Sequence, residues 1–150
     1  MLILAALLLQ PAVPALSAAE RNAAFAAAGL TRVGGGWRSC AEDPEARAEI
    51  EQFVDLNGDG QKEAIIAESA MACSGDVPAY WIVTPAAPGK WRLVTSGRGM
   101  IEPLATKGAG GWRDLEIGGP GFCFPVERFN GREYALTRHQ YDGKACKPRR

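Results

Sequence analysis

Short runs of apolar residues, separated by turn residues, fill most of the sequence after residue 48. Runs of this length rich in Val, Ile, Phe, Tyr and Trp are typical of β-strands. We therefore predict strands in seven stretches and near Trp37, the stretches being residues 49–56, 63–69, 80–84, 91–96, 112–119, 124–129 and 132–141. Because turn residues rather than long helices connect these runs, the strands are expected to be antiparallel.

A different pattern precedes the strands. Residues 18–30, AAERNAAFAAAGL, are rich in alanine, carry Phe25 and Leu30 as large apolar residues, and include Gly29 as a candidate C-terminal cap. A helix of about ten residues is marginal on its own, so it must dock on other structure. The prediction is a mostly β, α+β domain, in which one antiparallel sheet of about seven strands carries one N-terminal helix.

Two dipeptides indicate hairpin turns. Asn130-Gly131 separates the runs 124–129 and 132–141, and Asp142-Gly143 follows the second run. Asn-Gly and Asp-Gly favour two-residue turns in which both central residues adopt positive φ. Both pairs are therefore expected to adopt that geometry.

The N-terminus has the features of an export signal. An apolar run from Leu2 to Leu9 is followed by prolines and small residues. The run is far shorter than the ~20 residues of a membrane span. We predict a signal peptide over residues 1–19 and a single β-rich domain over 20–150. A buried N-terminal helix is the alternative, since no basic residue precedes the run and Ser17 with Glu20 forms a capping-box pattern that cleavage after Ala19 would remove.

Composition narrows the class of protein. The 150 residues include 17 basic and 17 acidic side chains and have no net charge. Nucleic-acid binding depends on a basic excess, so it is not expected. The richness in alanine and arginine suggests a bacterial source, and the chain is expected in the periplasm or as a secreted protein.

Four cysteines, Cys40, Cys73, Cys123 and Cys146, occur without a C-x-x-C spacing. In an exported chain an even number of cysteines favours disulfides over a zinc site. Three pairings are possible. Because Cys40 and Cys73 bracket one predicted hairpin and Cys123 and Cys146 bracket another, we predict the bonds Cys40–Cys73 and Cys123–Cys146.

The most informative chemistry lies in VDLNGDGQKE, residues 54–63. Oxygen-bearing side chains recur at alternate positions around Gly60, and the candidate calcium ligands are Asp55, Asn57, Asp59, Gln61 through its carbonyl, and Glu63. Such a set suits calcium, but the twelfth position of an EF-hand would be Ile66, which excludes that motif. A plain turn with solvated acids is the alternative.

This stretch resembles the D-x-N-x-D-G-x-x-E/D loop of FG-GAP-type and VCBS-type repeats, which form propeller blades. The resemblance covers residues 49–69 and, more loosely, 112–138, where Asp114 alone remains of the acidic ladder. It implies a structural calcium ion and a role in adhesion or surface recognition. The chain is too short for a whole propeller, so a sheet related to one or two blades is expected. The stretches GGPGFCFPVERFNGREY and YDGKAC also resemble a family of small exported bacterial proteins of unknown function.

Catalytic signals are sparse. His139 is the only histidine, and Ser69, Ser74 and Ser96 lack a nucleophile-elbow sequence. Asp114 and Glu116, two residues apart on a predicted strand, are candidates to act with Glu68 as acid and base in sugar hydrolysis. The commoner role of such carboxylates is solvation of a strand surface.

Aromatic residues suggest binding. Five of them fit either a sheet core or a ligand surface, namely Trp37, Tyr80, Trp81, Trp91 and Trp112. The loop at residues 118–125 presents Phe122 or Phe124 to a partner, or is simply held by Cys123. The leading hypothesis is a non-enzymatic exported domain, stabilised by calcium, that binds an envelope protein or glycan. An inhibitor or immunity-like protein and a carboxylate-dependent glycan hydrolase are the alternatives.

Overall fold

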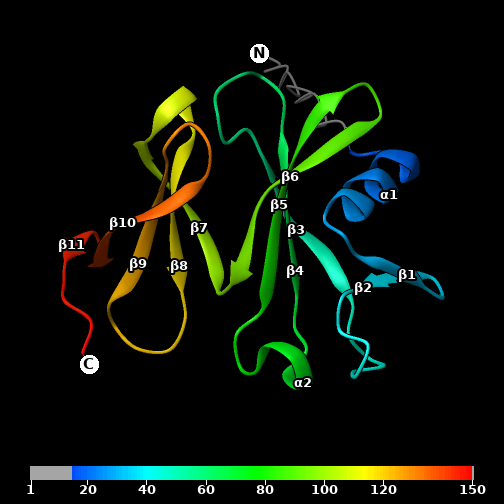
Figure 1. Ribbon diagram of the computed structural model, residues 1–150, viewed down its shortest axis with the longest axis horizontal. Helices are drawn as coiled ribbons and strands as arrows, with labels where there is room; N and C mark the ends of the chain where they lie inside the picture. The colour runs from blue at the N-terminus through cyan, green and yellow to red at the C-terminus, as the bar shows by residue number, and fades with distance from the viewer. Residues whose placement is uncertain (1–14, 150) are drawn as a thin grey trace, which may run out of the picture.

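The computed structural model describes residues 15–149 of the chain. It has three layers, which Figure 1 shows from right to left as a helix, a four-stranded sheet and a five-stranded sheet. A small hairpin of β1 (Thr31–Val33) and β2 (Gly36–Arg38) lies beside the helix. The order of layers follows the chain, so each layer forms largely from one continuous segment.

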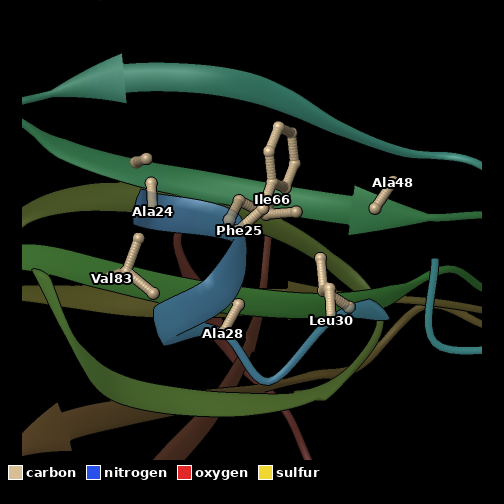
Figure 2. Packing of buried hydrophobic residues seen from close by; sticks show 8 residues of the cluster. Ala24, Phe25, Ala28, Leu30, Ala48, Ile66 and Val83 are labelled. Atoms are coloured by element: carbon tan, nitrogen blue, oxygen red, sulfur yellow. The ribbon is translucent and has the colours of Figure 1, made fainter. Parts of the chain in front are cut away.

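The helix α1 (Ala18–Ala27) confirms the predicted N-terminal helix. Gly29 adopts φ 78° just after the helix, as a C-terminal capping residue requires. Phe25 and Ala28 face Ile66 and Val83 of the sheet (Figure 2), and all four side chains are buried. The helix therefore docks on the sheet as its short length demands.

The middle sheet runs in the order β3 (Ala48–Val54), β4 (Glu63–Glu68), β5 (Ala79–Ala87), β6 (Lys90–Arg98), with every pair antiparallel. Every residue of β4 is buried. Ile66 faces the helix, whereas Ile65 packs in the core between the two sheets. Because both faces of the sheet are covered, β4 has no solvent-facing side.

The chain then passes through Gly99 into the second sheet. Its strands follow sequence order, namely β7 (Met100–Lys107), β8 (Arg113–Gly118), β9 (Phe124–Phe129), β10 (Tyr134–Tyr141) and β11 (Lys144–Ala145). Leu115 of β8 and Tyr134 of β10 meet Ile65 and Ile82 of the first sheet in a common core. This core holds the two sheets together.

The mostly β class and the single N-terminal helix are confirmed, but the prediction of one sheet of about seven strands is wrong. Residues 15–149 contain eleven strands in three sheets. β7 was not predicted, because Pro103 interrupts its apolar pattern. The strand accommodates this proline because β7 pairs on one side only. The short helix α2 (Met71–Ser74) and a turn of 3-10 helix, η1 (Ala109–Gly111), were also not predicted.

The two predicted turns differ in outcome. Asp142 and Gly143 both have positive φ, 48° and 72°, and confirm the predicted geometry between β10 and β11. Asn130-Gly131 does join two paired strands, but only Gly131 has positive φ among the two. The connection has four residues, and the Asn130 side chain accepts hydrogen bonds from the backbone of Arg132 and Glu133. The longer loop, folded by a side chain, replaces the two-residue turn.

Both predicted disulfides are present, Cys40–Cys73 and Cys123–Cys146. Each spans a hairpin, β3–β4 in the first case and β9–β10 in the second. The predicted leader lies largely outside the described residues, which include only 15–19 of it. Across residues 15–149, each helix is too short or too polar to traverse a bilayer.

Candidate functional site

The acidic loop, residues 55–62, connects β3 to β4 and is folded by its own side chains. Asp55 accepts hydrogen bonds from the backbone N–H groups of Gly58 (2.7 Å) and Gly60 (2.9 Å). Asn57 accepts from Asp59, and Asp59 accepts from Gln61. Gly58 and Gly60 have φ of 77° and 87°, which lets the backbone circle these oxygens.

Glu63 lies at the first position of β4 and is fully buried. One carboxylate oxygen accepts from the Leu56 N–H at 2.6 Å, and the other accepts from the Thr84 hydroxyl at 2.8 Å. Glu63 therefore closes the base of the acidic loop and joins it to β5.

The loop carries the oxygen-bearing side chains that calcium requires, but the carboxylates of Asp55, Asp59 and Glu63 do not form one close group. Within residues 15–149, the one set of three His, Cys, Asp or Glu ligand atoms mutually within 4.8 Å belongs to Cys40, Glu42 and Cys73. The two cysteines of that set form a disulfide, so it is not a metal site. Asp55, Asn57 and Asp59 stand at the surface of the loop, whereas Glu63 points into the protein.

The charges of the loop affect one another. Burial raises the pKa of the Asp55 carboxyl, but backbone N–H groups, led by that of Gly60, outweigh burial and leave the pKa lowered. Burial raises the pKa of Glu63, and the negative charges of Asp59 and Asp55 raise it further, against the opposing hydrogen bonds from Leu56 and Thr84. A cation in the loop would relieve this repulsion.

The acidic loop is also attached to the second sheet. Leu56 is fully buried in the core between the sheets, and its carbonyl accepts a hydrogen bond from the Arg113 N–H at 2.8 Å. A Cβ added to Gly111 would lie 2.7 Å from the carbonyl oxygen of Asn57. The loop is therefore held between β8 and the start of β4.

A groove of about 600 Å³ opens beside the acidic loop. Most of its wall comes from three parts of the chain, namely residues 15, 16 and 20 before and within α1, residues 60–62 of the acidic loop, and residues 85–89 at the end of β5 and in the turn to β6. Phe53 and Trp91 line it with apolar rings, and both are half-buried against the helix-side core. Lys62 places its ammonium group 5.6 Å from the centroid of the Phe53 ring. The groove thus combines aromatic faces with polar groups, and its wall includes the loop that carries the candidate calcium ligands.

The five predicted binding aromatics do not share a surface. Tyr80 and Trp112 are buried in the core between the sheets, and burial together with the Glu127 charge raises the pKa of Tyr80 to about 12. Trp37 stacks on Phe25 with ring centroids 5.7 Å apart. Trp81 is half-buried against the helix-side core. Of the five, Trp91 alone lines the 600 Å³ groove.

The candidate catalytic acids do not lie in one sheet, because Glu68 belongs to β4 whereas Asp114 and Glu116 belong to β8. Glu68 is buried in β4 and accepts hydrogen bonds from the Ser39 N–H, the Ser39 hydroxyl and the Cys40 N–H. Asp114 is buried in β8 of the other sheet, where it accepts from Arg128, Arg138 and Thr106. Glu116, on the same strand, accepts from Gln140. Each of the three carboxylates accepts at least one hydrogen bond from another part of the fold.

The remaining candidates also have defined positions. Phe122 is 74% exposed in the β8–β9 loop and packs edge-on against Tyr141. Phe124 begins β9 and is half-buried. His139 is half-buried in β10, and the Ser74 hydroxyl donates to the Ala70 carbonyl. Ser69 and Ser96 are exposed.

Sequence reasoning missed two features of the surface. Phe53, Lys62 and Glu20 come from separate segments and meet only at the groove, so no linear pattern marks them. The two arginines on Asp114, Arg128 and Arg138, are likewise separated along the chain and meet only through strand pairing. The one signal that the sequence offered for this cluster was Asp114 itself, an acidic residue within a predicted strand.

Comparison with known protein families, curated protein sequences and solved structures found no match to this chain.

Proposed function

We propose that this protein is a non-enzymatic exported binding domain whose groove recognises an envelope glycan. The observation that carries the proposal is the union of the Phe53 and Trp91 rings with Gln61 and Lys62 in one groove of about 600 Å³. Ligand sites of small molecules have volumes of about 300–1,000 Å³ and combine apolar walls with a few polar groups. Sugar rings present apolar faces for stacking and hydroxyl groups for hydrogen bonds, so they match this combination.

Calcium bound in the acidic loop would stabilise one wall of the groove. In this proposal Asp55, Asn57 and Asp59 hold the ion through their side-chain oxygens, and Gln61 holds it through its carbonyl. Glu63, the fifth candidate ligand, supports the loop from below through Leu56 and Thr84. Because residues 60–62 belong both to the loop and to the groove, binding of the ion and of the glycan would be coupled.

Export to the periplasm or the medium is supported by two observations. The two disulfides are typical of proteins in oxidising compartments. The apolar run from Leu2 to Leu9 and the small residues after it have the composition of a signal peptide. A chain of no net charge is suited to neither nucleic acid nor a strongly charged surface.

Calcium binding is tested by thermal unfolding with calcium and with a chelator. If the dissociation constant is about 0.1 mM, 1 mM calcium stabilises the fold by about 1.4 kcal/mol. Asp59→Asn is expected to reduce this effect, because it removes one ligand charge and keeps the acceptor oxygen. Asp76→Asn, at an exposed position outside the loop, is the control and should respond like wild type. Identical unfolding with calcium and chelator would remove the ion from the proposal.

Glycan binding is tested by isothermal titration with soluble fragments of the bacterial envelope glycans. Trp91→Ala is expected to weaken binding at least tenfold, because the stacking face is lost. Phe122→Ala, a change to an aromatic residue outside the groove lining, should leave binding unchanged. Equal binding by wild type and Trp91→Ala would overturn the assignment of the groove.

One observation favours the inhibitor or immunity-like alternative. Phe122 is the most exposed of the large apolar side chains described, and the neighbouring Cys123–Cys146 bond anchors its loop. A rigid loop with an exposed aromatic anchor is typical of protein recognition. Under this alternative Phe122→Ala abolishes capture of a protein partner, whereas Trp91→Ala does not.

A further inference from the structure

The beginning of α1 is held by a reciprocal pair of hydrogen bonds. The Glu20 N–H donates to the Ser17 hydroxyl at 3.2 Å, and the Ser17 N–H donates to a Glu20 carboxylate oxygen at 2.9 Å. Together they form a capping box, which satisfies two backbone donors that the helix itself cannot satisfy. These contacts also lower the pKa of Glu20, led by the hydrogen bond to the Ser17 side chain, in keeping with a charged capping carboxylate.

Cleavage after Ala19 would remove this cap. It would delete Ser17, which is the N-cap, and Ala18 and Ala19, which are the first two helical residues. It would also place a positively charged α-amino group on Glu20, at the end of the helix where the dipole disfavours positive charge. The mature chain would therefore begin with a shortened and uncapped helix.

Ala15 and Leu16, the two residues just before Ser17, also contact the folded domain. Ala15 and Leu16 line the 600 Å³ groove beside Glu20, and Leu16 is half-buried. Cleavage after Ala19 would remove this part of the groove wall together with the cap. A cut before Leu16 would keep Leu16, Ser17 and the whole of α1.

The sequence offers such a cut. Val13 and Ala15 stand three and one residues before the Ala15–Leu16 bond, and that bond is closer to the apolar run ending at Leu9 than the bond after Ala19 is. Short side chains at these two positions are the requirement of signal-peptide cleavage. We propose that a signal peptidase hydrolyses the Ala15–Leu16 bond. Water adds across the amide, leaving the carboxylate on Ala15 and the α-amino group on Leu16. The mature protein then keeps its helix cap and Leu16, the half-buried residue of this part of the groove wall, and loses only Ala15 from the groove lining.

This proposal rests on the proposed export and is tested with the full chain in a Gram-negative bacterial host. The periplasmic fraction is collected, and the N-terminus is identified by intact mass and by N-terminal sequencing. The expected mature protein begins at Leu16 and carries both disulfides.

Two exposed alanines provide matched variants. Ala15→Gln is expected to block cleavage at the proposed bond, whereas Ala19→Gln should leave the N-terminus at Leu16. A wild-type chain that begins at Glu20, with processing blocked by Ala19→Gln and not by Ala15→Gln, would overturn the proposal while leaving export intact. A full-length chain retained in the cytoplasm would overturn export and the cleavage site together.

Discussion

At the scale of single residues, Asp114 connects four strands of the second sheet. Its fully buried carboxylate accepts hydrogen bonds from Thr106 of β7, Arg128 of β9 and Arg138 of β10, while Asp114 itself lies in β8. Both arginines are partly exposed, so their charges stay in contact with water. The carboxylate is therefore satisfied at a small desolvation cost to its partners.

Asp114→Asn is expected to lower the free energy of unfolding by about 2–3 kcal/mol, because hydrogen bonds to a charged acceptor are replaced by weaker ones. Urea unfolding followed by circular dichroism measures the loss. Glu116→Gln is the control, since that residue is half-buried on the same strand and makes one side-chain hydrogen bond. Equal losses in the two variants would contradict a special role for Asp114.

Gly99 joins the two sheets with φ of 132°. A Cβ at this position would lie 2.4 Å from the Ile117 Cγ2 atom and 2.7 Å from the Gly118 carbonyl oxygen. Gly99→Ala is therefore expected to destabilise the fold by at least about 2 kcal/mol through strain and overpacking. Gly35→Ala, where a Cβ meets no atom within 4 Å, should change the melting temperature little. Similar melting temperatures for both variants would show that the corner adapts easily.

At the scale of elements, the β3–β4 hairpin connects the candidate ion site to the rest of the fold. Glu63 closes the base of the acidic loop through the Leu56 N–H, and the Leu56 carbonyl accepts a hydrogen bond from Arg113 of β8. A change in the second sheet can therefore alter the position of the loop, although every candidate ligand belongs to the β3–β4 hairpin of the first sheet.

Gly111→Ala is expected to weaken calcium binding, because the new Cβ would press on the Asn57 carbonyl oxygen at 2.7 Å and displace the loop. Gly110→Ala is a close control. Both glycines have positive φ and would suffer similar backbone strain, but at Gly110 the nearest atom to a new Cβ belongs to Trp112, at 3.5 Å. Titration with calcium measures the difference, and equal affinities in the two variants would mean that the second sheet does not position the loop.

At the scale of the whole molecule, the order of the layers explains how a chain of this size buries both faces of its middle sheet. α1 covers one face of the β3–β6 sheet, and the β7–β11 sheet covers the other (Figure 1). The ends of β4 carry Glu63 and Glu68, both buried, and each is satisfied by groups from neighbouring segments. Glu63 thus links one end of β4 to the acidic loop and β5, and Glu68 links the other end to residues 39 and 40 after β2.

Acid unfolding depends on these buried carboxylates. Burial alone raises the pKa of Asp114, but hydrogen bonds from Arg128, Thr106 and Arg138 hold it well below its usual range. As the pH falls below about 4, the unfolded chain takes up this proton first, so the stability contributed by Asp114 is progressively lost. Glu63 acts oppositely, because its raised pKa makes protonation favour the folded state.

The stability gap between wild type and Asp114→Asn is therefore expected to be constant from neutral pH down to about 4 and to shrink below it. Urea unfolding of both proteins over a pH series measures the gap. A gap that stays constant into strong acid would contradict the lowered pKa.

Local signals in the sequence were sufficient where neighbouring residues decide the structure. The capping box of Ser17 and Glu20, the turn at Asp142-Gly143 and the two hairpins that bring the cysteines together all depend on short segments. The sequence did not predict β7, because Pro103 is tolerated in a strand that pairs on one side and not in a strand that pairs on both. The number of neighbours of a strand is decided by the tertiary structure.

The sequence by itself thus determined the β class, the helix, most strands, both disulfides and the acidic loop, since periodicity, caps and turn residues act over a few positions. Only the tertiary structure decided that the strands divide into separate sheets, that Glu63 turns inward, and that Phe53 and Trp91 share a groove with the acidic loop. These features arise where segments distant in the chain pack together to cover both faces of β4. That packing depends on the shapes and volumes of all the layers at once, which no local pattern records.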